Sequence, residues 1–278
     1  MEGNVIRFLK VDDDFYEGSY LNRITYNPSS NSVLTKLTLW VLNCGYIWTV
    51  GHVFPSDSIL LELGCAGGVD YFGSRFKMIG LDLSFKSLTQ LNGYQLGIQA
   101  SATEIPLADN SVDGIISSFF WEHIDLETKE KMLNEFKRVL KTSGKMVFLY
   151  DVESQNTLVN GMRSTDPIKY QKLFKDNDGH IGYATPTDSQ LQFTQAGFKV
   201  IKHFGMERTW VQSSSVYEKM RHFNGVWGWI GKFFFFIFSW RLTIWANMIL
   251  VRIVDETIGR MWPLRKSRII MTVVQKIE

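Results

Sequence analysis

The chain has 278 residues, with 30 basic against 28 acidic side chains and a formal net charge of +2. That length suits one large domain or a core with one substantial insertion, and a charge so near neutrality argues against a dedicated nucleic-acid binder. Two cysteines provide no disulfide framework, and the first ten residues lack a secretory apolar core. We therefore expect an intracellular, cytoplasmic protein.

The N-terminal part, residues 1–57, is predicted to form a cap and a first helix. Residues 1–31 are polar and aromatic, with three acids at 12–14. Apolar side chains within 32–49 recur at helical rather than strand spacing, so we expect a helix there that packs against a sheet.

Residues 58–84 combine an apolar strand, a turn of small residues and a second strand. The first strand ends in Glu62, and the turn that follows consists of Gly64, Cys65, Ala66, Gly67 and Gly68. Small residues let the backbone approach a nucleotide-like ligand, and the N–H groups of the next helix face the same place. The second strand delivers Asp82, at the position where a βαβ nucleotide fold hydrogen-bonds a ribose diol.

The remaining periodic segments extend this sheet. Alternating or buried apolar runs predict strands at 96–100, 112–118, 145–150, 197–204 and 268–276. Amphipathic patterns predict helices at 125–141 and 187–196. Right-handed crossovers place the first five strands in one parallel sheet, with the substrate beyond the carboxyl ends of strands four and five.

The glycine turn at 62–68, Asp82 and the segments 100–116 and 133–141 are four motifs within 58–150. Together they resemble motifs of the class I S-adenosylmethionine-dependent methyltransferases. The segment 62–68 is similar to their acidic-x-Gly-x-Gly-x-Gly turn, and 100–116 is similar to their "GDA…LPF.D.SFD.V" stretch. Residues 133–141, Leu-Asn-Glu-Phe-Lys-Arg-Val-Leu-Lys, look like their "E..RVLKPGG" helix end. In that family, a segment such as 1–31 often covers the cofactor or substrate entrance, while the other interpretation is a solvated lead-in.

The resemblance implies an α/β, Rossmann-like fold with S-adenosyl-L-methionine as cofactor. The expected sheet has seven strands, mostly parallel with an antiparallel last strand, helices on both faces, and a helical aromatic insertion between strands six and seven. The implied domains are the methyltransferase core at 58–212, the insertion at 213–267 and the last core strand at 268–278. The cofactor-binding residues carried over from the family are Glu62, Gly64, Cys65, Ala66, Gly68, Asp82, Leu83, Ser101, Ala102 and Phe119.

Two positions depart from the family pattern. Ala66 replaces the usual second glycine, which requires a φ below zero or modest strain. Ser101 replaces an acid that contacts the adenine amino group, and its hydroxyl can still accept a hydrogen bond. We therefore expect weaker cofactor affinity rather than none.

Methyl transfer to oxygen or nitrogen also requires removal of a proton from the acceptor. His123, directly after the fourth strand, is the predicted base, because a Glu-His pair at this point resembles many small-molecule O-methyltransferases; the other interpretation is a packing or capping role. Asp151, after the fifth strand, is the second predicted catalytic residue, and His180 and Tyr183 are weaker candidates in the covering loop predicted at 151–190. No Cys or His cluster has metal-ligand spacing, so we predict no metal.

The segment 213–268 carries nine basic and three acidic residues and is rich in Trp and Phe. Its stretch 233–251 is long enough to span a membrane, but strands six and seven must pair in one sheet, so both ends lie on one side of a bilayer. Tryptophans at both ends and interspersed bases favour an interfacial helix or hairpin at 225–254 on the inner face of the membrane. A cap over the substrate pocket or a homodimer face is the alternative.

The sequence therefore predicts a methyltransferase, with O-methylation of a hydrophobic or membrane-associated acceptor such as a lipid-linked glycan, a quinone or isoprenoid, or a lipid. Two alternatives remain. One is a cytosolic sugar or secondary-metabolite methyltransferase that uses the insertion as a lid or dimer face. The other is a module that binds S-adenosylmethionine without turnover.

Overall fold

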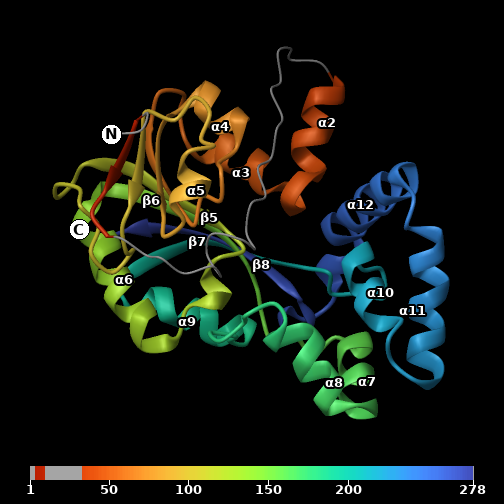
Figure 1. Ribbon diagram of the computed structural model, residues 1–278. Coiled ribbons are helices and arrows are strands. Elements are labelled where there is room, and N and C mark those ends of the chain that lie inside the picture. Colours follow the sequence, from red (N-terminus) through yellow and green to blue (C-terminus); the bar gives the residue numbers. More distant parts are fainter. Residues whose placement is uncertain (1–3, 10–32, 278) are drawn as a thin grey trace.

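The computed structural model describes residues 4–9 and 33–277 and contains one eight-stranded mixed sheet (Figure 1). The strands are β1 (Val5–Arg7), β2 (Ile59–Leu63), β3 (Lys77–Asp82), β4 (Leu96–Gln99), β5 (Val112–Ser118), β6 (Leu140–Asp151), β7 (Phe198–Met206) and β8 (Ile269–Lys276). Their spatial order is β1-β4-β3-β2-β5-β6-β8-β7. Strand β8 pairs antiparallel with both β6 and β7, and every other pairing is parallel. The predicted Rossmann-like sheet with a reversed last strand is confirmed.

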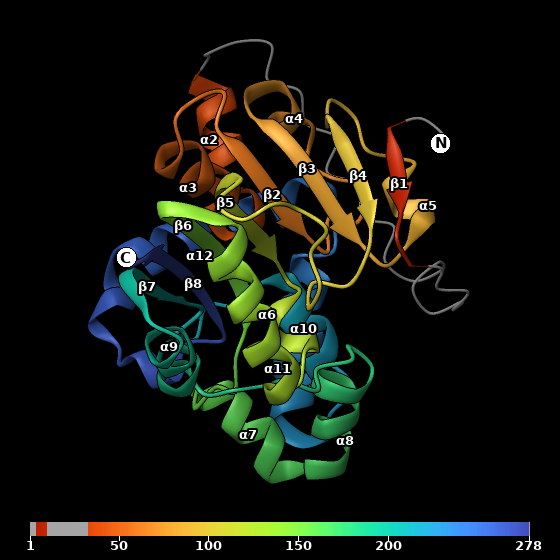
Figure 2. The same ribbon diagram turned by 90° about the vertical axis from the view of Figure 1, so that its left-hand side faces the viewer.

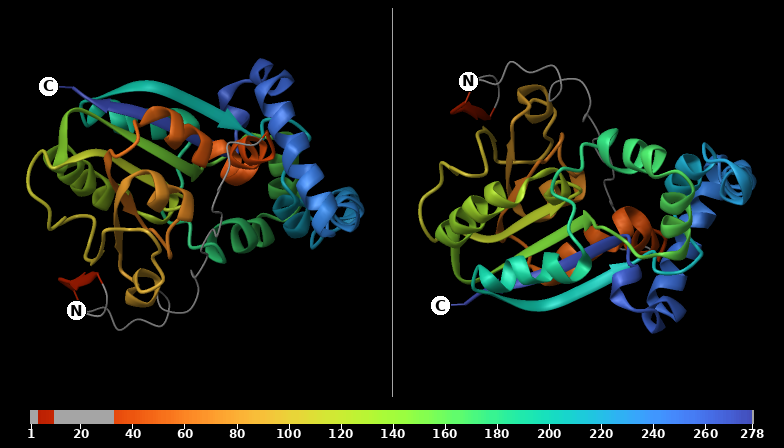
Figure 3. Two further views of the ribbon diagram at one scale, coloured as in Figure 1. Left: turned by 90° about the horizontal axis from the view of Figure 1, so that it is seen from above. Right: turned by 90° about the horizontal axis from the view of Figure 1, so that it is seen from below.

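Helices cover both faces of the sheet (Figure 3). They are α2 (Val33–Val41), α3 (Tyr46–Val53), α4 (Asp70–Arg75), α5 (Phe85–Leu88), α6 (Leu126–Val139), α7 (Thr157–Thr165), α8 (Pro167–Gln171), α9 (Pro186–Gln195), α10 (Ser214–Met220), α11 (Gly225–Ile237) and α12 (Arg241–Glu256). Successive side chains of a strand point to opposite faces, so Leu61 packs with α6 and α9, whereas Leu60 packs with α3 and α4.

Two predictions for the N-terminal part need correction. The helix expected at 32–49 is two helices, because Asn43 and Cys44 have φ values of 45° and 52° that break the helical path between α2 and α3. The sheet also gains an eighth strand, because residues 5–7 pair in parallel with β4 at its edge. The acidic and aromatic residues at 12–26 lie outside the described part of the chain.

The segment predicted as a covering loop at 151–190 is largely helical. It contains α7, α8 and a π-helical turn at Lys172–Asp176. These helices gather with α10, α11 and α12 at one end of the sheet and form a lobe (Figures 1 and 2). The chain enters the lobe from the carboxyl ends of β6 and β7, where an acceptor is expected.

Within the described residues, one helical stretch, Val33–Val53, has the length and hydropathy of a membrane span. Its second half includes Tyr46, Ile47 and Val50, which are fully buried against the sheet. Helices α11 and α12 reach the same threshold only if they count as one span, and they are bent by 115° relative to one another.

Candidate active site

The turn after β2 requires glycine at its start. Gly64 has a φ of +58°, and a Cβ atom placed there would lie 2.7 Å from the Phe120 ring. Gly67 and Gly68 also have positive φ values. The positive φ and the nearby Phe120 ring both exclude larger side chains at Gly64. Because of its glycines, the turn can present its main chain to a ligand.

Asp82 lies at the carboxyl end of β3 and joins the two segments that the sequence assigns to the cofactor. Its Oδ2 accepts a hydrogen bond from the Ala66 N–H at 2.9 Å, and its Oδ1 accepts one from the Ser84 N–H at 2.8 Å. A carboxylate at this strand end is the group that accepts hydrogen bonds from a ribose diol in βαβ nucleotide folds. Ala66 has a φ of +42°, so it adopts the strained alternative rather than a φ below zero.

Glu62 lies beneath the turn rather than at its surface. The side chain is buried, and its Oε2 accepts a hydrogen bond from the Tyr94 hydroxyl. The same hydroxyl accepts from the Val69 N–H at 3.1 Å, so Tyr94 links the strand end to the start of α4. Burial raises the pKa of Glu62 to about 8, with a smaller contribution in the same direction from Asp82.

The other predicted cofactor residues follow neighbouring strands. Leu83 directly follows β3, and its carbonyl accepts from Gln99 Nε2 at 2.8 Å. Ser101 follows β4, and its hydroxyl lies 2.7 Å from that of Thr103, while Ala102 is buried beside it. Phe119 follows β5 with a φ of 52° and a partly exposed ring. Strands β4, β3, β2 and β5 are consecutive and parallel in the sheet, so these positions share one edge of it, with Cys65 buried below that edge.

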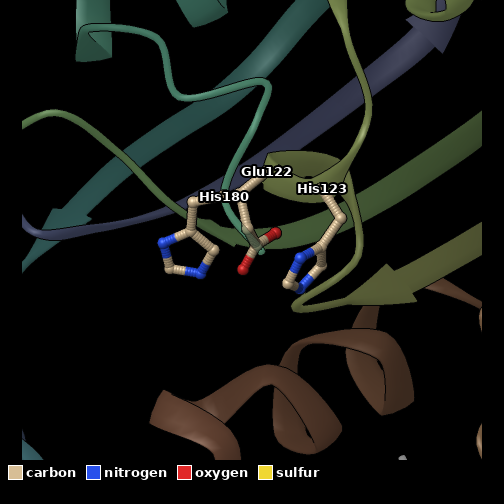
Figure 4. Close-up of side chains that lie close together, drawn as sticks. All are labelled: Glu122, His123 and His180. Atoms are coloured by element: carbon tan, nitrogen blue, oxygen red, sulfur yellow. The ribbon is translucent and has the colours of Figure 1, made fainter. Parts of the chain in front are cut away.

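His123 ends a short 3-10 turn, Trp121–His123, after β5. Its Nδ1 lies 3.0 Å from the Gly179 carbonyl oxygen, and its ring lies 5.2 Å from that of His180 (Figure 4). Burial lowers the pKa of His123, while hydrogen bonding to the backbone of Gly179 and Phe119 opposes that shift. A neutral imidazole is therefore favoured at this place.

Two buried carboxyl groups accompany the histidines. Glu122 Oε1 accepts a hydrogen bond from the Asp151 N–H at 3.3 Å, while Glu122 Oε2 and Asp151 Oδ1 have no hydrogen-bond partner among the described residues. Burial raises the pKa of Glu122 well above its ordinary value, and Asp151 adds to this. Burial also raises the pKa of Asp151 to about 6. The His180 Nε2 atom is 3.9 Å from Asp151 Oδ2.

Glu122, His123 and His180 form a cluster whose ligand atoms all lie within 4.8 Å of one another. The sequence alone predicts no metal, because His180 is far from the Glu-His pair along the chain. The segment 151–190 folds back so that His180 lies beside Glu122 and His123, and the carbonyl oxygen of the preceding residue, Gly179, contacts His123. The sequence marks Glu122 only as the neighbour of His123 in the Glu-His pair, and it gives no sign of Tyr94, because burial and contacts alone reveal the roles of these two residues.

A model of a methyltransferase domain matches residues 61–148, which run from β2 to β6 and contain the glycine turn, Asp82 and His123. The chain therefore contains a class I S-adenosylmethionine-dependent methyltransferase domain. The predicted family is confirmed, and S-adenosylmethionine is the cofactor of this methyltransferase family.

Curated relatives of the methyltransferase domain include two uncharacterized proteins. One, from Methanocaldococcus jannaschii, is 27% identical over 146 residues, which are 52% of this chain and 63% of that protein. The other, from Haemophilus influenzae, is 26% identical over 173 residues, which are 56% of this chain and 64% of that protein. The match thus spans less than two thirds of either relative.

Solved structures of methyltransferases share the fold. A methyltransferase from Archaeoglobus fulgidus gives a TM-score of 0.51 with 16% identity and covers 85% of this chain and 93% of its own. The geranyl diphosphate C-methyltransferase from Streptomyces coelicolor gives a TM-score of 0.53 with 10% identity, over 84% of this chain and 76% of its own. That protein was solved with Mg²⁺, geranyl-S-thiolodiphosphate and S-adenosyl-L-homocysteine.

Proposed function

We propose that this protein transfers the methyl group of S-adenosylmethionine to an oxygen of a hydrophobic or membrane-associated acceptor, and that it works at the surface of an anionic membrane. The observation that carries the proposal is an exposed apolar face on α11 and α12, in the lobe that the chain enters from the carboxyl ends of β6 and β7. Lipid-linked glycans, quinones or isoprenoids, and lipids are acceptor classes that suit this arrangement.

The cofactor side of the proposal rests on how well the edge of the sheet suits the molecule. The main chain at Gly64, Ala66 and Gly68 would face the cofactor, and both oxygens of Asp82 would accept from its ribose. Leu83, Ser101, Ala102 and Phe119 would surround the adenosine, while Glu62 and Cys65 support the turn from beneath. When bound, the cofactor supplies a methyl group activated by a sulfonium.

The acceptor side is assigned to His123 and Asp151. His123 follows β5, and Asp151 is the last residue of the adjacent strand β6, at the same edge of the sheet. As the new C–O bond forms and the C–S bond breaks, the acceptor oxygen must give up its proton, and these residues are proposed to act on that proton. The surrounding buried side chains exclude water, which helps to align the acceptor.

The outer face of α11 supports the membrane part of the proposal. Trp229 and Phe236 are 77% and 74% exposed, and with Val226 and Phe233 they recur every three or four residues along one side of α11. Trp240, which directly precedes α12, is 70% exposed. The opposite side packs on α10, where the Phe234 ring stacks on Tyr217 at 4.8 Å. A Cβ atom at Gly228 would collide with the Phe223 carbonyl oxygen, so the inner side of α11 lies close to the backbone of the preceding segment.

Helix α12 continues this surface. Leu242 is 85% exposed and Trp245 is also exposed, while Asn247 and Arg252 are buried on the inner side. The basic side chains Lys232 and Arg241 are exposed near these apolar residues. Aromatic rings bordered by bases suit an anionic membrane surface better than a second protein surface. The bend between α11 and α12 also suits a pair that lies on a bilayer rather than crosses it.

The test is turnover with S-adenosylmethionine and lipid extracts, followed by mass spectrometry of the methylated product. We expect S-adenosylhomocysteine to form only with the apolar fraction of the extract. Turnover with water-soluble sugars instead would support the cytosolic alternative. Binding of the cofactor without any turnover would support the non-catalytic one, and a stable dimer that ignores vesicles would assign the apolar face to a second copy.

A further inference from the structure

Three side chains near the proposed binding place of the methyl acceptor could together hold a metal ion. Glu122, His123 and His180 each offer one ligand atom, and these atoms lie within 4.8 Å of one another (Figure 4). One carboxylate with two imidazoles is a set that transition metals favour, whereas Mg²⁺ and Ca²⁺ prefer oxygen ligands. We propose that these three side chains bind a divalent transition metal ion.

Glu122 provides an independent sign that a cation belongs here. Its side chain is 1% exposed, and its Oε2 has no hydrogen-bond partner in the described part of the chain. Buried carboxylate oxygens are ordinarily satisfied by donors or metals, because an unpartnered one is unfavourable. Lys129, a cation that acts on Glu122, instead donates to the Gly182 carbonyl at 2.7 Å.

His180 presents a nitrogen in the state that a metal requires. Its Nδ1 lies 3.0 Å from the Phe174 carbonyl oxygen, and since a carbonyl only accepts, Nδ1 carries the hydrogen. The Nε2 atom therefore keeps its lone pair, which is the usual arrangement of a ligating histidine held by a backbone carbonyl. That atom lies 3.9 Å from Oδ2 of Asp151, whose Oδ1 is buried and has no hydrogen-bond partner within residues 4–9 and 33–277. When both carboxyl groups are ionised, Nε2 and the oxygens of Asp151 and Glu122 are all acceptors, and a cation would satisfy them together.

The geometry allows the cluster to close around an ion. Ligand atoms of a four-coordinate zinc lie about 3.4 Å apart. Since the three atoms lie within 4.8 Å of one another, they need to approach by at most about 1.4 Å. His123 ends a three-residue turn and His180 follows the π-helical segment, so neither is held inside a long helix. The contact of His123 with the Gly179 carbonyl already joins the two chain segments.

The role of the ion rests on the proposed function, whereas its binding does not. An ion held beside the carboxyl ends of β5 and β6 would bind the acceptor oxygen and lower the pKa of its hydroxyl. The proton would then pass to the Asp151 carboxylate as the oxygen takes the methyl group. His123 would serve this step as a ligand of the ion rather than as a direct proton acceptor.

The test is titration of the full chain, without a histidine tag and after treatment with a chelator, with Co²⁺ followed by competition with Zn²⁺. We expect one equivalent of Co²⁺ to bind with ligand-field absorption in the visible, and Zn²⁺ to displace it. Glu122→Gln and His180→Ala should each weaken Co²⁺ binding about tenfold or more. His222→Ala removes an exposed imidazole outside the cluster and should leave binding unchanged.

Absence of saturable Co²⁺ and Zn²⁺ binding by the wild-type chain overturns the inference, as does binding that both cluster variants retain. Circular dichroism checks that the variants fold, and if one does not, the wild-type titration decides alone. S-adenosylmethionine binding is measured on the same samples. A chain that binds the cofactor but no metal contradicts this inference alone, whereas one that binds metal but not the cofactor contradicts the proposed function.

Discussion

The carboxylate of Asp82 accepts a hydrogen bond from the backbone N–H of Ala66 at 2.9 Å, which ties the tip of β3 to the turn after β2. The bond holds Ala66 at a φ of +42°, a conformation that alanine rarely adopts. The proposed ribose ligand therefore also shapes the turn that lies beside the cofactor. A change at Asp82 should affect both parts of the cofactor site at once.

Asp82→Ala should weaken S-adenosylmethionine binding by about 1.5–3 kcal/mol, because a charged acceptor is lost from the ribose. Isothermal titration calorimetry measures this directly. Glu127→Ala, which removes an exposed carboxylate of α6, is the matched control and should bind as the wild type does. If Asp82→Ala binds the cofactor with unchanged affinity, the assignment of this edge of the sheet is wrong.

His123→Ala should lower kcat by roughly a hundredfold or more and leave cofactor affinity nearly unchanged, because its role is confined to the acceptor. The expectation holds whether the imidazole acts directly or through a bound metal. Steady-state kinetics and calorimetry on the same preparation separate the two quantities. His52→Ala, at an exposed position of α3, serves as control. Unchanged turnover would return His123 to a packing role.

The buried Glu62 should make stability depend on pH. Its pKa is raised to about 8 in the folded chain, from an ordinary value near 4.5, so the folded state binds the proton more tightly. Glu62 therefore contributes fully to the free energy of unfolding below about pH 4.5. As the pH rises toward 8 this contribution is lost, by at most about 1.4 kcal/mol per pH unit.

Glu62→Gln should remove that slope, because an amide cannot titrate and its oxygen can still accept from Tyr94. Urea unfolding at several values between pH 5 and 8 measures the difference between the two chains. The free energy of unfolding of the variant should increase relative to that of the wild type as the pH rises. Curves that remain parallel over this range would mean that Glu62 keeps an ordinary pKa.

The sequence was sufficient to predict the sheet and the cofactor edge because both depend on local patterns. Apolar runs ending in Glu62 and Asp82 mark the strand tips, and the glycine turn between them is continuous in the chain. The boundaries of β5 agree with prediction, since Val112–Ser118 is bounded by polar residues on its near side and by Phe119 in a left-handed conformation.

The acceptor side could not be predicted in the same way. The cluster of Glu122, His123 and His180 brings together residues more than fifty positions apart in the sequence, and no local sequence pattern predicts such a long-range contact. The helices α7 and α8 were also missed, because Gly161 and Pro167 indicate turns. Pro167 instead occupies the first turn of α8, where its missing N–H needs no partner.

The last prediction concerns the exposed apolar face on α11 and the start of α12. Phe234 points inward onto Tyr217, so the residues to replace are Trp229, Phe236 and Trp240. Changing these three to Ser should abolish flotation with vesicles of phosphatidylcholine and phosphatidylglycerol, because the rings no longer enter the acyl boundary, while S-adenosylmethionine binding persists. Wild-type binding should weaken with salt but not vanish, since salt screens only the basic side chains. The control variant has Ser in place of Leu126, Ile168 and Ile201, three exposed apolar residues outside this face. This variant should bind vesicles as the wild type does. A wild-type chain that ignores anionic vesicles at low salt contradicts the proposal.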